Sequence, residues 1–427
     1  MLVFPAGTEI GLEIHAALYG FHDIRIFGAG EPESSPARFV FAEYHEVRNV
    51  HTEGWLEQLV ALCKKLQIHY IFPAHDDVVV ALSAERARIP ATIITSSNDF
   101  CQTTRSKSAT YRRLEGIVPV PRLYLSADEV AQYPVLVKPD RGQGSSGVQR
   151  VDNAEDLMLV LRQTAEPIIC EYLPGDEYTV DCFSSGTDGL LFAGARRRNR
   201  MRNGISVNSD TVELPEARAL ATAIDCKLKP RGAWFFQLKR SAEEILTLLE
   251  VAPRIAGTMA VHRVSGVNFP RLSLLDAEGH HVQILTNPGG VEVDRALCNR
   301  YRSPIRFNTL YVDLDDTLLR DKILDESVMR LICRCLNQEI HLVLITERDP
   351  TVGGMPKIAS LFNEVVQVQP TQPRSDFLCE ASAIYVDNSF HRRLEVNRSK
   401  NIPTFDVSMI ELLHCHAQDA KLKESTK

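Results

Sequence analysis

The sequence predicts an α/β protein with more than one domain, and three observations support this prediction. In the first hundred residues, short apolar runs such as Leu2–Phe4 and Tyr70–Phe72 alternate with amphipathic stretches, as in βα units around a parallel sheet. Near residue 310, an apolar run ends in a cluster of aspartates, and two similar runs follow it. The chain has 427 residues, 44% of them hydrophobic, which is enough for two or three packed cores.

The composition argues against nucleic-acid and membrane partners. The formal charge is -7, from 48 Lys and Arg against 55 Asp and Glu, and the basic residues form no stripe that nucleic acid would require. The ten cysteines include no CxxC pair, which predicts reduced thiols in a cytosol. No stretch approaches the ~20 apolar residues of a membrane span, and the chain start lacks a signal-peptide pattern. We expect a soluble, cytoplasmic protein and leave homo-oligomerisation open.

A first domain is predicted over residues 1–104. Its first strand turns through Pro5–Gly11 into a helical pattern, which places a glycine turn at the carboxyl end of a strand, where doubly wound sheets bind ligands. The turn lacks a full GxGxxG pattern, and an ordinary strand-to-helix connection explains it equally well. We therefore assign no nucleotide to this turn.

A second domain is predicted over residues 105–304, and its strongest signal is a phosphate-binding loop. The strand Val135–Pro139 carries Lys138 and runs directly into Asp140–Val148, where three glycines and two serines fall within six residues. Bare backbone N–H groups in such a loop can surround phosphate oxygens beside a fixed lysine. No Gly-Lys-Ser/Thr follows, so this is not a Walker loop, and an exposed hairpin turn is the competing interpretation.

Further strand patterns follow in a recognisable order: Ile168–Asp181, then Trp234–Lys239, then Leu248–Arg254. Together with the lysine strand and its loop, they resemble the ATP-grasp superfamily, specifically the carboxylate–amine ligases close to the large subunit of carbamoyl-phosphate synthetase. The resemblance covers residues 1 to about 300 and implies a Rossmann-like domain preceding an α+β ATP-grasp domain.

The resemblance implies a set of site residues and a reaction. Gln237 and Glu250 match Mg²⁺ ligands, and Arg254 matches the arginine that neutralises the transferred phosphoryl group. In the family, a carboxylate attacks the γ-phosphate and an amine then displaces phosphate from the acyl phosphate, which implies small-molecule carboxylate and amine substrates. The implied ATP contacts are Lys107, Lys138, Gly142, Gly144, Ser145, Ser146, Gly147, Glu171, Leu173 and Glu177.

One position departs from the family pattern. The family usually reads Glu-x-Asn-Pro-Arg, and Ala252 stands at the asparagine position with no oxygen to offer a metal. Either one ion is bound weakly with water in the gap, or the site binds nucleotide without efficient turnover. The basic run Arg196–Arg202 falls where related enzymes carry substrate-binding arginines, and a solvated basic turn is the alternative.

A third domain is predicted over residues 305–418, before a polar tail at 419–427. The strand Leu310–Asp313 ends in Asp-x-Asp-x-Thr, and carboxylates at i and i+2 beyond a buried strand can converge on a cation while one attacks phosphorus. With the downstream strands His341–Thr346 and Ala383–Val386, the pattern resembles the haloacid-dehalogenase-like superfamily, a doubly wound α/β fold. A helix-capping acidic turn is the competing interpretation.

This second resemblance implies a Mg²⁺-dependent phosphatase acting on a phosphorylated substrate. Two positions differ from the family, because Asn388 replaces the second aspartate and Arg374 stands for the lysine. The spacing between motifs leaves no room for a cap domain, so we expect an open site that accepts a large substrate or is covered by a neighbouring domain. The implied residues are Asp313 as nucleophile, Asp315 as general acid/base, Thr346 as phosphate anchor, Arg374 as cation, and Asp313, Asp315, Asp387 and Asn388 around the metal.

The leading interpretation is a bifunctional ligase and phosphatase whose two sites serve successive steps on one intermediate. The alternative is an ATP-sensing regulatory protein in which only the phosphatase turns over, and Ala252 is the feature that supports it.

Overall fold

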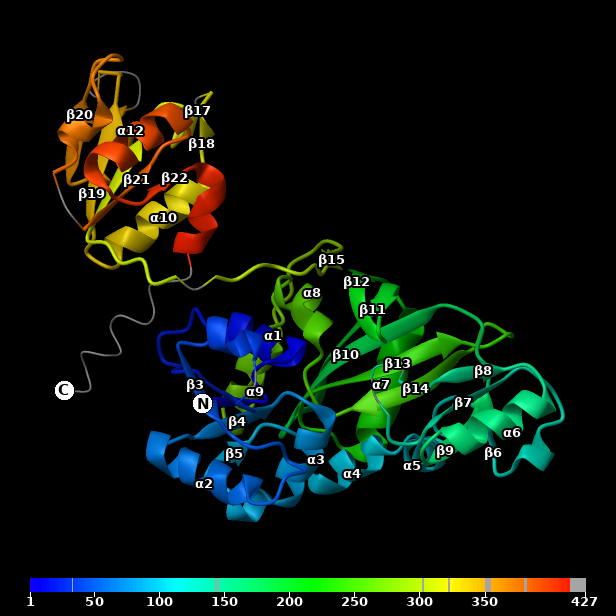
Figure 1. Cartoon of the computed structure of the whole chain (residues 1–427). Coiled ribbons are helices and arrows are strands. Elements are labelled where there is room, and N and C mark those ends of the chain that lie inside the picture. The colour runs from blue at the N-terminus through cyan, green and yellow to red at the C-terminus, as the bar shows by residue number, and fades with distance from the viewer. Residues whose placement is uncertain are drawn as a thin grey trace. The chain divides into compact units, whose positions relative to one another are not determined.

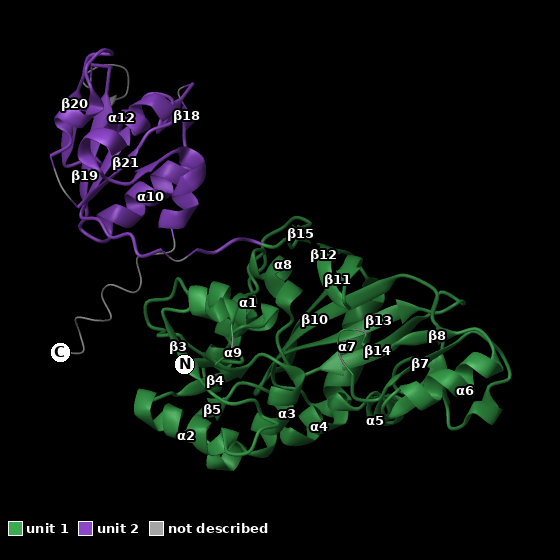
Figure 2. Ribbon diagram, viewed as in Figure 1, with its two compact units in different colours: residues 1–297 green, residues 298–427 purple. Residues whose placement is uncertain are grey.

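A computed structural model of the chain separates into two compact units, residues 1–297 (unit 1) and 298–427 (unit 2) (Figure 2). The division falls shortly before the boundary expected at residue 304. Ser145 and the tail at 419–427 lie outside the part of the chain that the structure describes. No helix among the described residues is long and apolar enough to cross a bilayer. The structure describes residues 1–32, 34–142, 144, 146–301, 303–321, 323–349, 355–379 and 382–414.

Unit 1 begins with a five-stranded sheet in the order β3-β2-β1-β4-β5 (Figure 1). Every pairing in it is parallel, which confirms the βα rhythm predicted from the sequence. A Cβ added at Gly7, in the glycine turn after β1, would lie 2.3 Å from Ser35 Oγ, so a serine side chain fills the space beside this turn. The elements are β1 (Leu2–Phe4), α1 (Glu9–Leu18), β2 (Phe27–Gly30), β3 (Glu43–Glu46), α2 (Trp55–Leu66), β4 (Tyr70–Pro73), α3 (Asp76–Ala84) and β5 (Thr92–Ile93).

Two antiparallel sheets complete unit 1. The smaller has the order β6-β9-β7-β8 and the larger the order β14-β13-β10-β11-β12-β15. Their elements, with the helices between them, are α4 (Asn98–Arg105), α5 (Lys107–Leu114), β6 (Leu123–Tyr124), β7 (Val135–Pro139), β8 (Gln149–Val151), α6 (Ala154–Gln163), β9 (Pro167–Glu171), β10 (Glu177–Ser185), β11 (Gly189–Arg202), β12 (Ile205–Thr211), α7 (Pro215–Leu228), β13 (Gly232–Arg240), β14 (Leu246–Ala252), α8 (Ala260–Arg263), α9 (Phe269–Ala277) and β15 (Glu292–Asp294).

One hydrophobic core joins the first sheet to the large antiparallel sheet. Val3 and Phe72 of the parallel sheet pack in the same buried cluster as Phe183, Phe235 and Phe269. Burial of several aromatic side chains in one cluster is a large apolar contribution to stability. The consequence for function is that α3 and the end of β14 are held at fixed positions on either side of one cavity.

Unit 2 is a five-stranded parallel sheet in the order β20-β19-β16-β21-β22. Its central strand β16 is fully buried, as are the apolar residues of β19 and β21 beside it. The elements are β16 (Thr309–Asp313), the two-stranded pair β17 (Leu319–Arg320) and β18 (Ile323–Leu324), α10 (Glu326–Leu336), β19 (His341–Thr346), α11 (Met355–Ala359), β20 (Glu364–Gln367), β21 (Ala383–Val386), α12 (Phe390–Lys400) and β22 (Thr404–Phe405).

Candidate functional site

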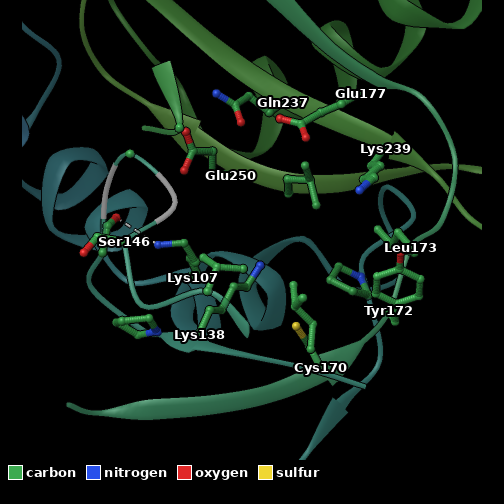
Figure 3. A pocket seen from close by; sticks show the side chains of 18 of the residues that line it. Lys107, Lys138, Ser146, Cys170, Tyr172, Leu173, Glu177, Gln237, Lys239 and Glu250 are labelled. Atoms are coloured by element: carbon green, nitrogen blue, oxygen red, sulfur yellow. Dashed lines mark hydrogen bonds between the residues drawn. The ribbon is translucent and has the colours of Figure 1, made fainter. Parts of the chain in front are cut away.

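A cavity of about 290 Å³ lies in unit 1 between the small sheet and the large one (Figure 3). It brings together most of the residues that the ATP-grasp resemblance implies, from strands and loops up to about 140 residues apart in the chain. It adjoins a larger cavity of about 790 Å³. The implied residues that line the smaller cavity are Lys107, Lys138, Gly142, Gly144, Ser146, Glu171, Leu173, Glu177, Gln237 and Glu250.

Two lysines form one wall of this cavity. Lys138 of β7 is 4% exposed and donates to Tyr111 Oη at 2.8 Å, and that hydroxyl donates to Leu249 O at 2.6 Å. Burial acts to lower the pKa of Lys138, but Tyr111 and other groups outweigh it and hold this pKa above its usual range. Lys107 Nζ donates to Gly142 O at 3.0 Å, and burial lowers the pKa of Lys107. The structure thus fixes one charged lysine and places a second at the phosphate loop.

Oxygen-bearing side chains form the opposite wall. Gln237 of β13 and Glu250 of β14 are register partners, so their side chains lie on the same face of the sheet. Glu250 accepts no side-chain hydrogen bond within the described residues. Amide and carboxylate oxygens are ligands that Mg²⁺ prefers, so this pair fits the metal that the resemblance implies. The neighbouring Glu177 accepts from Arg198, whose Nη1 also donates to Gln237 Oε1 at 3.1 Å.

Arg254 is held away from the smaller cavity. Its Nε and Nη2 donate to the two carboxylate oxygens of Asp76, at 2.5 and 2.8 Å, in a bidentate pair with the start of α3. Burial acts to raise the pKa of Asp76, but the Arg254 guanidinium outweighs it and holds this pKa below its usual value. Arg254 lines the larger cavity, next to Gln237 and Glu250. Arg254 therefore shares the larger cavity with Gln237 and Glu250.

Ala252 packs in the hydrophobic core and also lines a small cavity with Glu250 and Arg254. It is 6% exposed and lies opposite Phe235 in the register between β13 and β14. An apolar side chain thus stands at the position where the resemblance implies a metal ligand.

Only some of the described residues in the glycine-rich loop 142–147 and in the basic run 196–202 line the two cavities. Gly142, Gly144 and Ser146 line the cavity, whereas Gly147 does not, and its φ of +70° is one that favours glycine. Of the five arginines at 196–202, only Arg198 lines both cavities. The others pair mainly with carboxylates. Arg196 is held by Asp181, Arg197 by Asp210 and Arg200 by Asp294.

In unit 2, three predicted residues meet at the carboxyl edge of the sheet. Asp313 ends β16, Thr346 ends β19 and Asp387 directly follows β21. Burial, followed by the charge of Asp387, raises the pKa of Asp313 to about 8. Asn388 is nearby, where its N–H donates to Thr317 Oγ1 at 2.9 Å. The sequence therefore identified a real convergence of polar groups.

Asp313 itself is completely buried, while the open site expected from the motif spacing stays a prediction. Its Oδ1 lies 3.4 Å from Arg392 Nη1 and 3.9 Å from Arg374 Nε. Both arginines donate to Glu347, Arg374 through Nη2 at 2.6 Å. Arg392 and Arg374 of the same unit lie over Asp313, and Glu347 bridges the two arginines. Sequence reasoning missed Arg392 and Glu347, although Glu347 directly follows the predicted anchor Thr346.

Asp315 is held by neighbours at and directly after the end of β19. Its carboxylate accepts from Thr346 Oγ1 at 3.1 Å and from the Glu347 N–H at 3.0 Å, and it pairs with Arg348. No group of three His, Cys, Asp or Glu side chains within the described residues is arranged to hold a metal ion. Asp313 and Asp387 remain a fitting pair of oxygen donors for Mg²⁺, since Asp313 Oδ2 is buried without a hydrogen-bond partner.

Comparison with known proteins supports the ATP-grasp interpretation of unit 1. Residues 163–295 match the family described as "ATP-grasp in the biosynthetic pathway with Ter operon". A segment of 74 residues is 30% identical to D-alanine–D-alanine ligase of Fusobacterium nucleatum, and it covers 17% of this chain and 26% of that relative. The chain thus spans about a quarter of that curated relative.

Solved structures show the same fold at low sequence identity. The biotin carboxylase complex with β,γ-ATP from Campylobacter jejuni matches with a TM-score of 0.59 and 14% identity, over 68% of this chain and 74% of that one. N5-carboxyaminoimidazole ribonucleotide synthetase from Thermus thermophilus matches with a TM-score of 0.56 and 18% identity, over 68% and 82%. The synthetase from Staphylococcus aureus complexed with ADP gives 0.55 and 16%, over 66% and 78%. Together the comparisons show that residues 163–295 are similar to an ATP-grasp family and that about two thirds of the chain shares the fold of these solved structures.

Proposed function

We propose that unit 1 is an ADP-forming carboxylate–amine ligase that uses ATP and Mg²⁺. The observation that carries this proposal is the arrangement of the smaller cavity, in which Lys107 and Lys138 face Gln237 and Glu250. Cations on one wall and hard oxygen ligands on the other are what a polyphosphate with its metal requires. Two of the structurally similar proteins are complexes with ADP and with β,γ-ATP, which agrees with a nucleotide at this place.

Each group has a separate task in the proposed reaction. Lys138 and Lys107 hold phosphate oxygens, and Glu177 and Leu173 lie where the ribose and adenine would bind. Gln237 and Glu250 would hold Mg²⁺, which offsets negative charge on the phosphates when bound. The larger cavity gives room for the carboxylate and the amine. Arg254 lines this cavity and would neutralise negative charge on the transferred phosphoryl group. The carboxylate would attack the γ-phosphate, and the amine would then displace phosphate.

The test is ADP release by the purified chain with ATP, Mg²⁺ and pools of small carboxylates and amines. We expect at least one pool to stimulate ADP release and Lys138→Met to abolish the stimulation. ATP binding without stimulation by any pool would instead favour the ATP-sensing function, which the apolar packing of Ala252 supports.

We propose further that unit 2 is a Mg²⁺-dependent phosphatase, which would make the chain bifunctional. The supporting observation is that Asp313, Thr346 and Asp387 meet at one edge of a parallel sheet. In this proposal Asp313 attacks the phosphorus of a phosphate monoester, Asp315 protonates the leaving oxygen, and water then hydrolyses the aspartyl-phosphate. Hydrolysis of p-nitrophenyl phosphate tests the proposal, and the full chain should show it only with Mg²⁺ present.

A further inference from the structure

Two side chains that lie outside the predicted set cover Asp313. Arg392, in the first turn of α12, has its Nη1 3.4 Å from Asp313 Oδ1. Glu347, directly after β19, accepts from both Arg392 and the buried Arg374. Asp313 is 0% exposed, whereas the side chains of Arg392 and Glu347 are 29% and 25% exposed. The Arg392–Glu347 pair is therefore the outer layer between solvent and Asp313.

The buried polar atoms beneath this pair are not fully paired. Asp313 Oδ2 and Arg374 Nε are both buried without a hydrogen-bond partner. An unpaired polar atom in the interior costs free energy. Arg374 Nε can donate to a bound anion, whereas Asp313 Oδ2 is an acceptor and would need a cation or a donor. A phosphate group offers several acceptor oxygens to a guanidinium, and its phosphorus would lie next to the carboxylate of Asp313.

Glu347 occupies the place that such an anion needs. It is negatively charged, it accepts hydrogen bonds, and it bridges Arg374 and Arg392. Only one of two anions, the carboxylate or a phosphate, can accept from these guanidinium N–H groups at a time. Arg348 is anchored to Asp315, so the backbone next to Glu347 is tied to the same site.

We propose that Arg374 and Arg392 form a two-arginine cradle for the phosphate group of a phosphate monoester, and that Glu347 keeps this cradle closed over Asp313 until the phosphate displaces its carboxylate. The proposal rests on the phosphatase function proposed for unit 2. It adds Arg392 as a substrate-binding residue and Glu347 as an internal competitor of the substrate.

The experiment measures binding of inorganic phosphate to the full chain with Mg²⁺ by titration calorimetry, alongside KM and kcat for p-nitrophenyl phosphate. Glu347→Gln removes the competing charge and keeps the shape, so phosphate should bind about tenfold more tightly and KM should fall. Arg392→Gln should weaken phosphate binding about tenfold or more, and Arg392→Lys should recover part of the loss. Matched controls are Glu364→Gln on β20 and Arg398→Gln on α12, both exposed, which should leave both measurements unchanged.

Several outcomes would overturn the cradle. Phosphate binding that weakens or stays constant in Glu347→Gln would show that Glu347 does not compete with phosphate. Unchanged binding in Arg392→Gln would remove Arg392 from the site. Thermal melting of each variant identifies a loss caused by unfolding, in which case Arg392→Lys decides. Because binding is measured without turnover, a chain that binds phosphate as expected but does not hydrolyse the ester would refute the phosphatase and leave the cradle standing.

Discussion

Unit 1 and unit 2 both bring cationic and carboxylate side chains together, but they arrange them differently. In unit 1, Lys107 and Lys138 face Gln237 and Glu250 around a cavity of about 290 Å³. In unit 2, Arg374 and Arg392 contact Glu347 and approach Asp313 directly, so that Asp313 is buried. In unit 1 the side chains surround a cavity, whereas in unit 2 they fill the space over Asp313.

The difference follows from which structural elements supply the charged side chains in each unit. The cavity of unit 1 lies between elements of two separate sheets, so Lys107 and Lys138 stand across it from Gln237 and Glu250, although Arg198 pairs with Glu177 on the cavity wall. In unit 2 the groups follow neighbouring strands of one parallel sheet, which lie about 4.8 Å apart, so their side chains converge within contact distance. Opposite charges in contact and partly removed from water attract strongly. Oppositely charged side chains at one sheet edge are therefore expected to contact one another.

The most severe test of the comparison is Asp313→Asn. If the closed cluster of unit 2 is a phosphatase, loss of the nucleophile should reduce hydrolysis of p-nitrophenyl phosphate by about 10³-fold or more. Asp376→Asn, at an exposed position of the same domain, is the control and should keep full activity. Hydrolysis that survives in Asp313→Asn would mean that unit 2 does not use Asp313 as the nucleophile.

The counterpart in unit 1 is Lys138→Met, which keeps the length of the side chain and removes its charge. Because Lys138 is buried at the cavity wall, the affinity for ATP with Mg²⁺ should fall about 10- to 100-fold. Equilibrium titration with the nucleotide measures the change, and Lys64→Met, on the exposed face of α2, is the control. An unchanged affinity would place the polyphosphate elsewhere.

Much of the fold could be predicted because the sequence carried local signals for it. Alternating apolar runs predicted the parallel sheet of unit 1, and each strand that ends in Lys138, Asp313 or Thr346 is a strand in the structure. The glycine-rich loop could be placed because Gly142 and Gly144 directly follow the lysine strand. These signals lie within a few residues of one another, so no knowledge of tertiary packing was needed.

The missed features depend on contacts between distant segments. Arg254 pairs with Asp76, which is 178 residues away, and no local pattern indicates that pairing. Arg392 contacts Asp313, which lies 79 residues earlier in the chain. Its position in the first turn of a helix does not predict this contact. Arg392 of α12 and Glu347, directly after β19, cover Asp313, and no motif placed them there. The strand-end motifs predicted that Asp313, Thr346 and Asp387 meet, but they carried no signal for contacts from residues outside the motifs.

Ala252→Asn tests whether unit 1 is limited by its missing metal ligand. If Asn supplies the absent oxygen, the Mg²⁺ concentration for half-maximal nucleotide binding should fall by about tenfold. Ala252→Leu has the same number of side-chain heavy atoms as Ala252→Asn, branches at the same carbon and has no oxygen, so it serves as the control for crowding against Phe235 and the surrounding core. An equal response to Asn and Leu would show that position 252 acts by packing alone.

The smallest expected effects concern pH, and here the two units should respond in opposite directions. The pKa of Asp76 is held below its usual value because Arg254 outweighs the effect of burial, so this pair stabilises unit 1 above about pH 4 and loses that contribution as pH falls. Burial and Asp387 raise the pKa of Asp313 to about 8, so the stability linked to its proton is complete below about pH 4 and is lost as pH rises through 8.

Thermal melting without Mg²⁺ from pH 3 to pH 9 measures both effects against the parent chain. Asp76→Asn should lower the melting temperature at neutral pH, with the difference shrinking below pH 4. Asp313→Asn should raise it relative to the parent by about 3 °C at the alkaline end, with the difference shrinking toward acid pH. Added Mg²⁺ should reduce the difference in melting temperature between Asp313→Asn and the parent, because a cation beside Asp313 favours its ionised form. Two variants whose differences from the parent follow the same pH dependence would show that burial and Asp387 do not raise the pKa of Asp313.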